Sequence, residues 1–310
     1  MRVLVIGAGA SIEEARRSNV PEEYWPPVMN NFAEKLWNNH SGFFNYWLPD
    51  YLSSLGYDAV SDPTDYFIEL SKRSPESINI ERLFEFCWNN KGKKFPEDWQ
   101  NLIYHGILNP LSFLLIMGFF NEGQLIELKA GGIVTRKLSD GDIVLSLNYE
   151  TLFELAAEQS ARKITYSPNI FNGQGLLIVK PHGSMNLLAN EHRFKFCDLN
   201  CIGSVHSSLD DYRNWTAIIP PRFNKQYEQH PIARMIINPI SNIKPDVLTF
   251  WGVGLTDSDI DLVQIYKQWI GSATRIEVIN PDRVVESRIQ EVLNSEVIYY
   301  ATLDEWALAS

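Results

Sequence analysis

Residues 2–11 read RVLVIGAGAS, a short apolar run that leads directly into two glycines. Such a run, with no polar residue alternating along it, is typical of a strand buried on both faces of a parallel sheet. The glycines that follow allow a tight turn and a close approach of the backbone to a ligand. Because Glu13 and Glu14 follow at once, the run reads as a first strand rather than a secretory signal.

From residue 142 onward the chain alternates in the same way between short apolar runs and amphipathic stretches. The expected strands are DIVLSL, KITYS, LLIVK, WTAIIPP, VLTFWGV, RIEVIN and EVIYY. Parallel strands need crossover connections, and crossover helices cover both faces of their sheet. The sequence therefore predicts an α/β fold with a doubly wound, Rossmann-like parallel sheet, built from residues 1–30 and 126–310.

The segment between these parts, residues 31–125, is aromatic, polar and helical in rhythm. Asp62 and Pro63 precede a periodic apolar pattern and indicate a helix start. PEDWQNLIYHGIL, residues 96–108, carries a similar signal. We expect residues 31–125 to form a helical insertion or lid.

The composition restricts the class of protein. Hydrophobic residues make up 45% and charged residues 21%, which excludes a largely disordered chain. The formal net charge of −11 argues against general binding of nucleic acid, which needs a basic surface, although a local basic patch stays open. The apolar run at residues 111–120 is about half the length that spans a bilayer. We expect a cytoplasmic protein without a membrane span.

The cysteines do not suggest a metal site. There are three, Cys87, Cys197 and Cys201, and the last two form a C-x3-C pair without a second pair. A structural zinc ion needs four ligands, and the sequence offers no obvious set of four. We expect reduced thiols and no metal.

Five loops with chemically useful residues each follow an expected strand. They are Gly7–Ser11 (GAGAS), Ser146–Glu150 (SLNYE), Lys180–Ser184 (KPHGS), the stretch WGVGLTDSDI from Trp251, and Val278–Asp282 (VINPD). Taken singly, each has a structural explanation, such as turn geometry for the glycines and helix capping for Asn148 and the aspartates. Because ligands of open parallel sheets bind at the carboxyl ends of the strands, the fold would gather all five loops into one site.

These five motifs, in this order, resemble the sirtuin-like (silent information regulator) domain family, specifically its divergent bacterial NAD-hydrolase branch associated with antiviral defence. The resemblance covers about residues 1–25 and 140–290. It implies NAD as the substrate, no metal, and a Rossmann-like fold with a helical insertion after the first motif. The chain lacks the four-cysteine zinc ribbon of the family's deacylases and carries Leu147 where they have glutamine. The resemblance therefore favours water over an acyl-lysine as the nucleophile.

The resemblance also implies roles for individual residues. Asn148 and His182 would be catalytic, with Asn148 holding a water or ribose hydroxyl and His182 acting as general base. The expected NAD-binding residues are Gly7, Ala8, Gly9, Ser11, Gly252, Asn280 and Asp282. Glu150 is a second candidate base, but its place at a helix N-terminus, where acidic residues are favoured, explains it equally well.

The expected function is an NAD+ hydrolase that releases nicotinamide and ADP-ribose, as a gated effector of bacterial antiphage defence. Cyclisation of the ADP-ribose product is not excluded. The alternatives are an NAD-dependent protein deacylase and a non-catalytic NAD- or ADP-ribose-binding subunit. We expect a homo-oligomer, a defence partner such as an Argonaute or a HerA-type ATPase, or both. The insertion is expected to cover the nicotinamide end of the site and to supply much of that interface.

Overall fold

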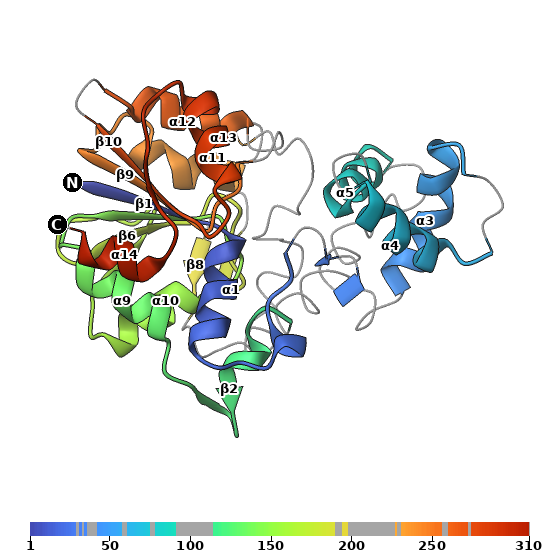
Figure 1. Ribbon diagram of the computed structural model, residues 1–310, viewed down its shortest axis with the longest axis horizontal. Helices are drawn as coiled ribbons and strands as arrows, with labels where there is room; N and C mark the ends of the chain where they lie inside the picture. The colour runs from blue at the N-terminus through green and yellow to red at the C-terminus, as the bar shows by residue number, and fades with distance from the viewer. Residues whose placement is uncertain are drawn as a thin grey trace.

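In the computed structural model, a parallel sheet lies between helices in the left-hand part of Figure 1. The residues that the structure describes are 1–28, 31–32, 34–35, 42–57, 61–74, 78–90, 114–189, 194–197, 227, 231–255, 260–271 and 274–309. The sheet has seven strands in the order β11-β10-β9-β1-β4-β6-β5, and every recorded pairing within it is parallel. The predicted fold class, a doubly wound α/β sheet, is confirmed.

The strands match the expected apolar runs closely. They are β1 (Arg2–Ile6), β4 (Ile143–Ser146), β5 (Ile164–Tyr166), β6 (Leu176–Val179), β9 (Val247–Trp251), β10 (Arg275–Ile279) and β11 (Ile298–Tyr300). The run WTAIIPP lies outside the described residues. In β1, Val3 and Val5 join the core on one face of the sheet while Leu4 and Ile6 join the core on the other. Both faces of β1 are therefore covered, which explains why its sequence is apolar throughout.

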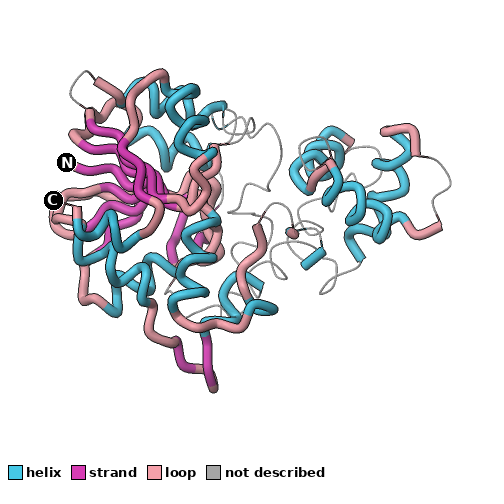
Figure 2. Tube along the Cα trace, in the orientation of Figure 1, coloured by secondary structure: helices cyan, strands magenta, loops and turns pink. Residues whose placement is uncertain are grey.

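Helices cover the two faces of the sheet (Figures 1 and 2). One face carries α1 (Ala8–Arg17), α9 (Lys129–Lys137), α10 (Leu152–Gln159) and α14 (Leu303–Leu308). The other carries α11 (Pro231–Ile237), α12 (Ile260–Trp269) and α13 (Val284–Leu293). The core on the first face includes Trp306 of α14, and the core on the second includes Trp269 of α12.

The described part of residues 31–125 is mainly helical. It contains α3 (Gly42–Ser54), α4 (Pro63–Arg73) and α5 (Ile80–Asn89). The predicted helix start is confirmed, since Asp62 accepts hydrogen bonds from the backbone N–H groups of Thr64 and Asp65, both at 3.1 Å. Buried residues of these helices belong to one cluster with Leu152 and Leu155 of α10, which joins the insertion to the sheet domain. Residues 96–108 lie outside the described part.

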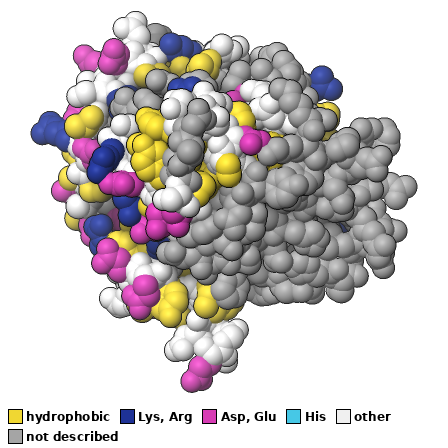
Figure 3. Space-filling model, turned by 90° about the vertical axis from the view of Figure 1, so that its right-hand side faces the viewer, with side chains coloured by type: hydrophobic (Ala, Val, Ile, Leu, Met, Phe, Trp, Pro, Cys, Tyr) yellow, Lys and Arg dark blue, Asp and Glu magenta, His cyan; other side chains and the backbone are white. Residues whose placement is uncertain are grey.

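The remaining elements are short. They are η1 (Glu22–Tyr24), η3 (Met117–Phe119), β2 (Phe120–Asn121), β3 (Gln124–Leu125), β7 (Leu187–Ala189), β8 (Phe194–Phe196) and η6 (Asn238–Ile240). None of the helices in the described ranges combines the length and the apolar character that crossing a bilayer requires. Figure 3 shows Lys and Arg side chains interspersed with Asp and Glu on the described part of one face.

Candidate functional site

A cavity of about 400 Å³ lies at the carboxyl ends of the parallel strands. Its size is within the usual range for small-molecule sites. The predicted site residues that line it are Gly7, Ala8, Gly9, Ser11, Asn148, His182, Gly252 and Asn280. They follow the strands β1, β4, β6, β9 and β10, so the tertiary structure brings together loops that are far apart in the sequence.

The cavity lies where the direction of winding changes. The helix after β1, α1, covers one face of the sheet, whereas α12, which follows the neighbouring strand β9, covers the other. Two loops that leave adjacent strands in opposite directions open a crevice between them, and ligands of doubly wound sheets bind there.

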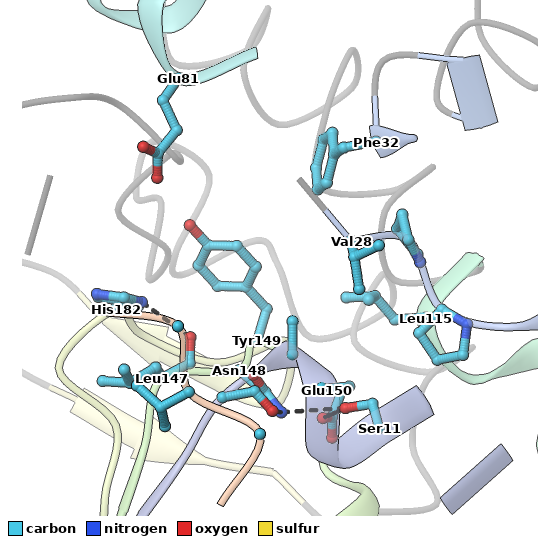
Figure 4. Close-up of a pocket in the computed structure, with 18 of the residues that line it drawn as sticks. Ser11, Val28, Phe32, Glu81, Leu115, Leu147, Asn148, Tyr149, Glu150 and His182 are labelled. Atoms are coloured by element: carbon cyan, nitrogen blue, oxygen red, sulfur yellow. Dashed lines mark hydrogen bonds between the residues drawn. The ribbon is translucent and has the colours of Figure 1, made fainter. Parts of the chain in front are cut away.

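Asn148 is held by two hydrogen bonds from its side-chain amide. Its Nδ2 donates to the carbonyl oxygen of Gly7 at 3.1 Å and to Ser11 Oγ at 3.0 Å. An amide nitrogen has two hydrogens, and both are thereby used. Asn148 can therefore form a hydrogen bond with a ligand in the cavity only as an acceptor, through its Oδ1 atom. Figure 4 shows Asn148, Ser11 and Glu150 side by side at the base of the cavity.

Glu150 completes this network as a buried carboxylate with both oxygens occupied. Ser11 Oγ donates to Oε1 at 2.6 Å, and the backbone N–H of Leu152 at the start of α10 donates to Oε2 at 2.6 Å. A carboxylate at a helix N-terminus is stabilised by the amides and the dipole of the helix. Through these two hydrogen bonds, Glu150 ties the Asn148 loop to α1 and α10.

A buried ion pair supports the same loop from behind. Lys180, at the end of β6, donates to the carbonyl oxygen of Glu150 and lies 2.8 Å from Glu154 Oε1. The side chains of Lys180 and Glu154 are 0% and 1% exposed. Burial raises the pKa of Glu154, and the charge of Lys180 opposes that rise. Lys180 therefore connects the KPHGS and SLNYE loops.

His182 is buried beside the cavity and is bonded at both ring nitrogens. Nδ1 lies 2.8 Å from the carbonyl oxygen of Leu147, and Nε2 is bonded to the hydroxyl of Tyr227. A carbonyl oxygen only accepts, so Nδ1 carries a hydrogen. In the neutral ring Nε2 then accepts from Tyr227.

The glycines of the first and fourth motifs have a structural cause. A Cβ atom at Gly7 would lie 2.6 Å from the carbonyl oxygen of Gly252, and one at Gly9 would lie 2.9 Å from the Cα atom of Gly252. Gly252 itself has φ of +63°, which other residues rarely adopt. Close packing of the β1 and β9 loops thus explains these glycines even without a ligand.

The packing of the β1 loop against the β9 loop also determines which backbone N–H groups at the start of α1 are available to bind an anion. The N–H groups of Gly9 and Ala10 donate to the carbonyl oxygens of Gly252 and Gly7, each at 3.0 Å. Ala8 is exposed, and its N–H has no hydrogen-bond partner among the described residues. An unpaired amide at a helix N-terminus is suited to bind a phosphate oxygen. Ala8 is therefore the best-placed backbone donor of the first motif.

Of the two predicted NAD-binding residues in the fifth motif, only Asn280 is among the described residues that line the cavity. Asn280 lines the cavity, and its Oδ1 accepts from the backbone N–H of Asp282 at 2.9 Å. Asp282 is exposed and is not among the described lining residues; its Oδ1 accepts from the N–H of Val284 at 3.0 Å and caps the start of α13. Four residues of the fourth motif, Thr256, Asp257, Ser258 and Asp259, lie outside the described residues.

Part of the lining comes from residues that sequence reasoning did not select. Pro26, Pro27, Val28, Phe32, Ile80, Glu81 and Leu115 contribute from the N-terminal connection and the insertion. Figure 4 shows Glu81 and Tyr149 directed toward the same space from opposite sides. Burial raises the pKa of Tyr149 well above its usual value, and the charge of Glu81 adds to the rise. Tyr149 therefore stays a neutral hydroxyl.

These residues carried no usable signal. Phe32, Ile80 and Leu115 resemble ordinary core residues in the sequence, and Tyr227 stands outside every recognised motif.

Among the described residues, no group of three or more His, Cys, Asp or Glu side chains could hold a metal ion. Cys197 forms no disulfide bond with another described residue, and Cys201 lies outside the described part. No protein-family model matches the chain, and no curated protein matches it.

Proposed function

We propose that this chain is an NAD+ glycohydrolase, which cleaves the bond between nicotinamide and ribose and releases nicotinamide and ADP-ribose. The observation that carries the proposal is the convergence of Ser11, Asn148 and His182 on one cavity at the switch point of a parallel sheet. Their three loops are among the five that resemble the sirtuin-like motifs.

The proposed reaction places few demands on the protein. Water forms a bond to C1′ of the ribose, and the C1′–N bond breaks with its electron pair returned to the ring nitrogen. That nitrogen is positively charged in NAD+, so nicotinamide leaves as a neutral molecule without a general acid. One proton of the attacking water stays on the new C1′ hydroxyl, and the other passes to a base, for which His182 is the candidate. The ribose carries oxocarbenium character in the transition state.

Asn148 would position the nucleophile. With both amide hydrogens bonded to Gly7 and Ser11, its Oδ1 can accept a hydrogen bond from the attacking water or from a ribose hydroxyl. The buried Ser11–Glu150 pair fixes the orientation of this amide. A nucleophile held in this way reacts faster because its orientation is set before the reaction.

The described lining of the cavity offers a dinucleotide apolar surface and a helix N-terminus, but no basic side chain. The described lining residues include no Lys or Arg, so the diphosphate would be bound mainly by the N-terminus of α1, with Ala8 as donor. Val253, Leu255 and Phe32 offer apolar surface to the rings. We place the adenosine half at Gly252 and Asn280 and the nicotinamide ribose at Asn148 and His182.

An enzyme of this kind would deplete its host of NAD, so we propose that it is gated. The proposed setting is the bacterial cytoplasm, as an effector of antiphage defence controlled by self-assembly or by a partner such as an Argonaute or a HerA-type ATPase. These proposals rest on the resemblance stated above.

A non-catalytic subunit that binds NAD or ADP-ribose is the second candidate. The hydrogen bonds on both nitrogens of His182 favour it, because a ring bonded in this way cannot accept a proton from water.

The decisive experiment incubates the purified chain with NAD+, alone and with the products of its neighbouring genes, and identifies the products chromatographically. We expect equal amounts of nicotinamide and ADP-ribose, and no product from the His182→Ala variant. Binding of NAD+ without turnover under every condition would favour the second candidate, and turnover that requires an acylated peptide would indicate a deacylase.

A further inference from the structure

The contact between His182 and Tyr227 joins two segments that are 45 residues apart. The two rings are nearly parallel, with centroids 5.6 Å apart and 26° between their planes. Tyr227 is 3% exposed and belongs to the core on the α12 face of the sheet. Its backbone N–H donates to Asp261 Oδ2 at 3.3 Å, which ties it to the first turn of α12.

Of the two ring nitrogens of His182, only Nε2 can serve as a general base. Nδ1 is committed to the carbonyl oxygen of Leu147, a backbone atom that follows β4 and is held in place by the sheet. A general base must therefore use Nε2, and Nε2 is bonded to Tyr227. If the ring is neutral, its lone pair accepts from the phenol; if it is charged, Nε2 carries a hydrogen and has no lone pair. In neither state does this arrangement let Nε2 take a proton from water.

We infer that Tyr227 is a positioning residue that masks the general base, so that His182 becomes active only when the hydrogen bond from the Tyr227 hydroxyl to Nε2 opens. The inference rests on the proposed function for its kinetic consequence. Tyr227 is not among the described residues that line the cavity, so it controls His182 from the side of the α12 core rather than by contact with substrate.

The matched substitution is Tyr227→Phe, which removes the hydroxyl and keeps the ring. We expect kcat for NAD+ cleavage by the chain alone to rise about tenfold, which corresponds to about 1.4 kcal/mol. Opening one hydrogen bond between neutral groups costs about this much. The KM for NAD+ should not change, because Tyr227 does not line the cavity. A purely structural role would instead lower the fraction of folded protein and leave kcat per folded molecule the same.

A second measurement does not depend on NAD. Diethyl pyrocarbonate acylates unprotonated imidazole nitrogens, and peptide mass spectrometry locates the modified histidine. We expect His182 to react faster in Tyr227→Phe than in the unmodified chain. Tyr166→Phe is the control, since Tyr166 is a partly buried tyrosine whose hydroxyl accepts from Asn186 at 3.2 Å. That variant should react at the rate of the unmodified chain.

A second pair of variants applies if Tyr227→Phe fails to fold. Asp261→Ala removes the acceptor for the Tyr227 backbone, whereas Asp261→Asn keeps an acceptor oxygen. Asp261→Ala should increase the modification of His182, and Asp261→Asn should not. An unchanged or slower modification rate in Tyr227→Phe, or a lower kcat per folded molecule, would overturn the inference. Absence of NAD+ cleavage in every variant would instead refute the proposed function, while the modification rates still decide whether Tyr227 masks His182.

Discussion

The side-chain amide of Asn148 lies 3.0 Å from the hydroxyl of Ser11, a residue 137 positions earlier in the chain. This contact joins the loops after β1 and β4, which are neighbours in the sheet but are separated in sequence by the whole insertion. Ser11 in turn donates to Glu150, so three buried polar side chains form a continuous network. Each member is oriented by the others, and all three residues line the cavity.

Replacing Asn148 with alanine should therefore affect activity more than stability. We expect kcat for NAD+ cleavage to fall at least about a hundredfold, since the oriented acceptor is lost. The free energy of unfolding should fall by about 1–2 kcal/mol, because Gly7 and Ser11 lose a donor. Steady-state kinetics and urea unfolding measure the two effects. A loss of stability with unchanged activity per folded molecule would indicate a capping role only.

Glu150→Gln distinguishes the two candidate bases. Glutamine keeps one acceptor for Ser11 but places an amide group against the N–H of Leu152, so we expect the free energy of unfolding to fall by about 1–3 kcal/mol. Activity per folded molecule should stay within about tenfold of the unmodified chain if His182 is the base. A loss of about a hundredfold or more, with His182→Ala still active, would transfer that role to Glu150.

Phe32→Ala tests whether the insertion forms part of the binding surface. The side chain of Phe32 lines the cavity and is 8% exposed. Loss of its contact with the ligand should raise the KM for NAD+ about tenfold while kcat changes little. Leu70→Ala in α4 is the control, since Leu70 packs in the same core cluster and is not among the described lining residues. Equal KM values for both variants would place NAD+ away from the insertion.

Lys180→Met should destabilise the fold by about 3–5 kcal/mol, because it leaves Glu154 buried without its cation. The double variant Lys180→Met/Glu154→Leu should recover a large part of that loss, since no unpaired charge remains buried. A double-mutant cycle from urea unfolding measures the coupling. Additive losses would show that the two side chains do not stabilise each other.

We expect the contribution of Glu277 to the stability of the fold to depend on pH. Burial alone would raise its pKa, but the hydrogen bonds from Trp306 and Thr249 and the charge of Arg2 outweigh it, so the folded-state pKa is lowered. A lowered carboxyl pKa stabilises the fold above the unfolded value of about 4.5, and the contribution is lost as the pH falls through the folded value. Glu277→Gln should therefore lower the melting temperature at pH 7, and the difference from the unmodified chain should shrink as the pH falls below the unfolded value. A constant difference across this range would contradict the assignment.

The fold could be predicted from the sequence because its evidence is local. Apolar runs such as Val3–Ile6 are buried on both faces, and a strand of this kind has few alternatives to a central position in a parallel sheet. The cap at Asp62 is equally local, since its partners lie two and three residues ahead. The placement of the motif loops at one edge follows from the parallel direction of the strands.

The sequence by itself determined the fold class, a doubly wound parallel sheet, and the edge at which Ser11, Asn148 and His182 meet. Apolar runs that alternate with amphipathic helices favour parallel strands, and the carboxyl ends of parallel strands share one edge of the sheet. Only the tertiary structure decided what each of these side chains contacts. In the folded chain both carboxylate oxygens of Glu150 accept hydrogen bonds, and His182 is hydrogen-bonded to Tyr227. Phe32 and Glu81 line the cavity. Such contacts join segments that are far apart in the chain, and their geometry depends on how helices pack on the sheet, which no local pattern encodes.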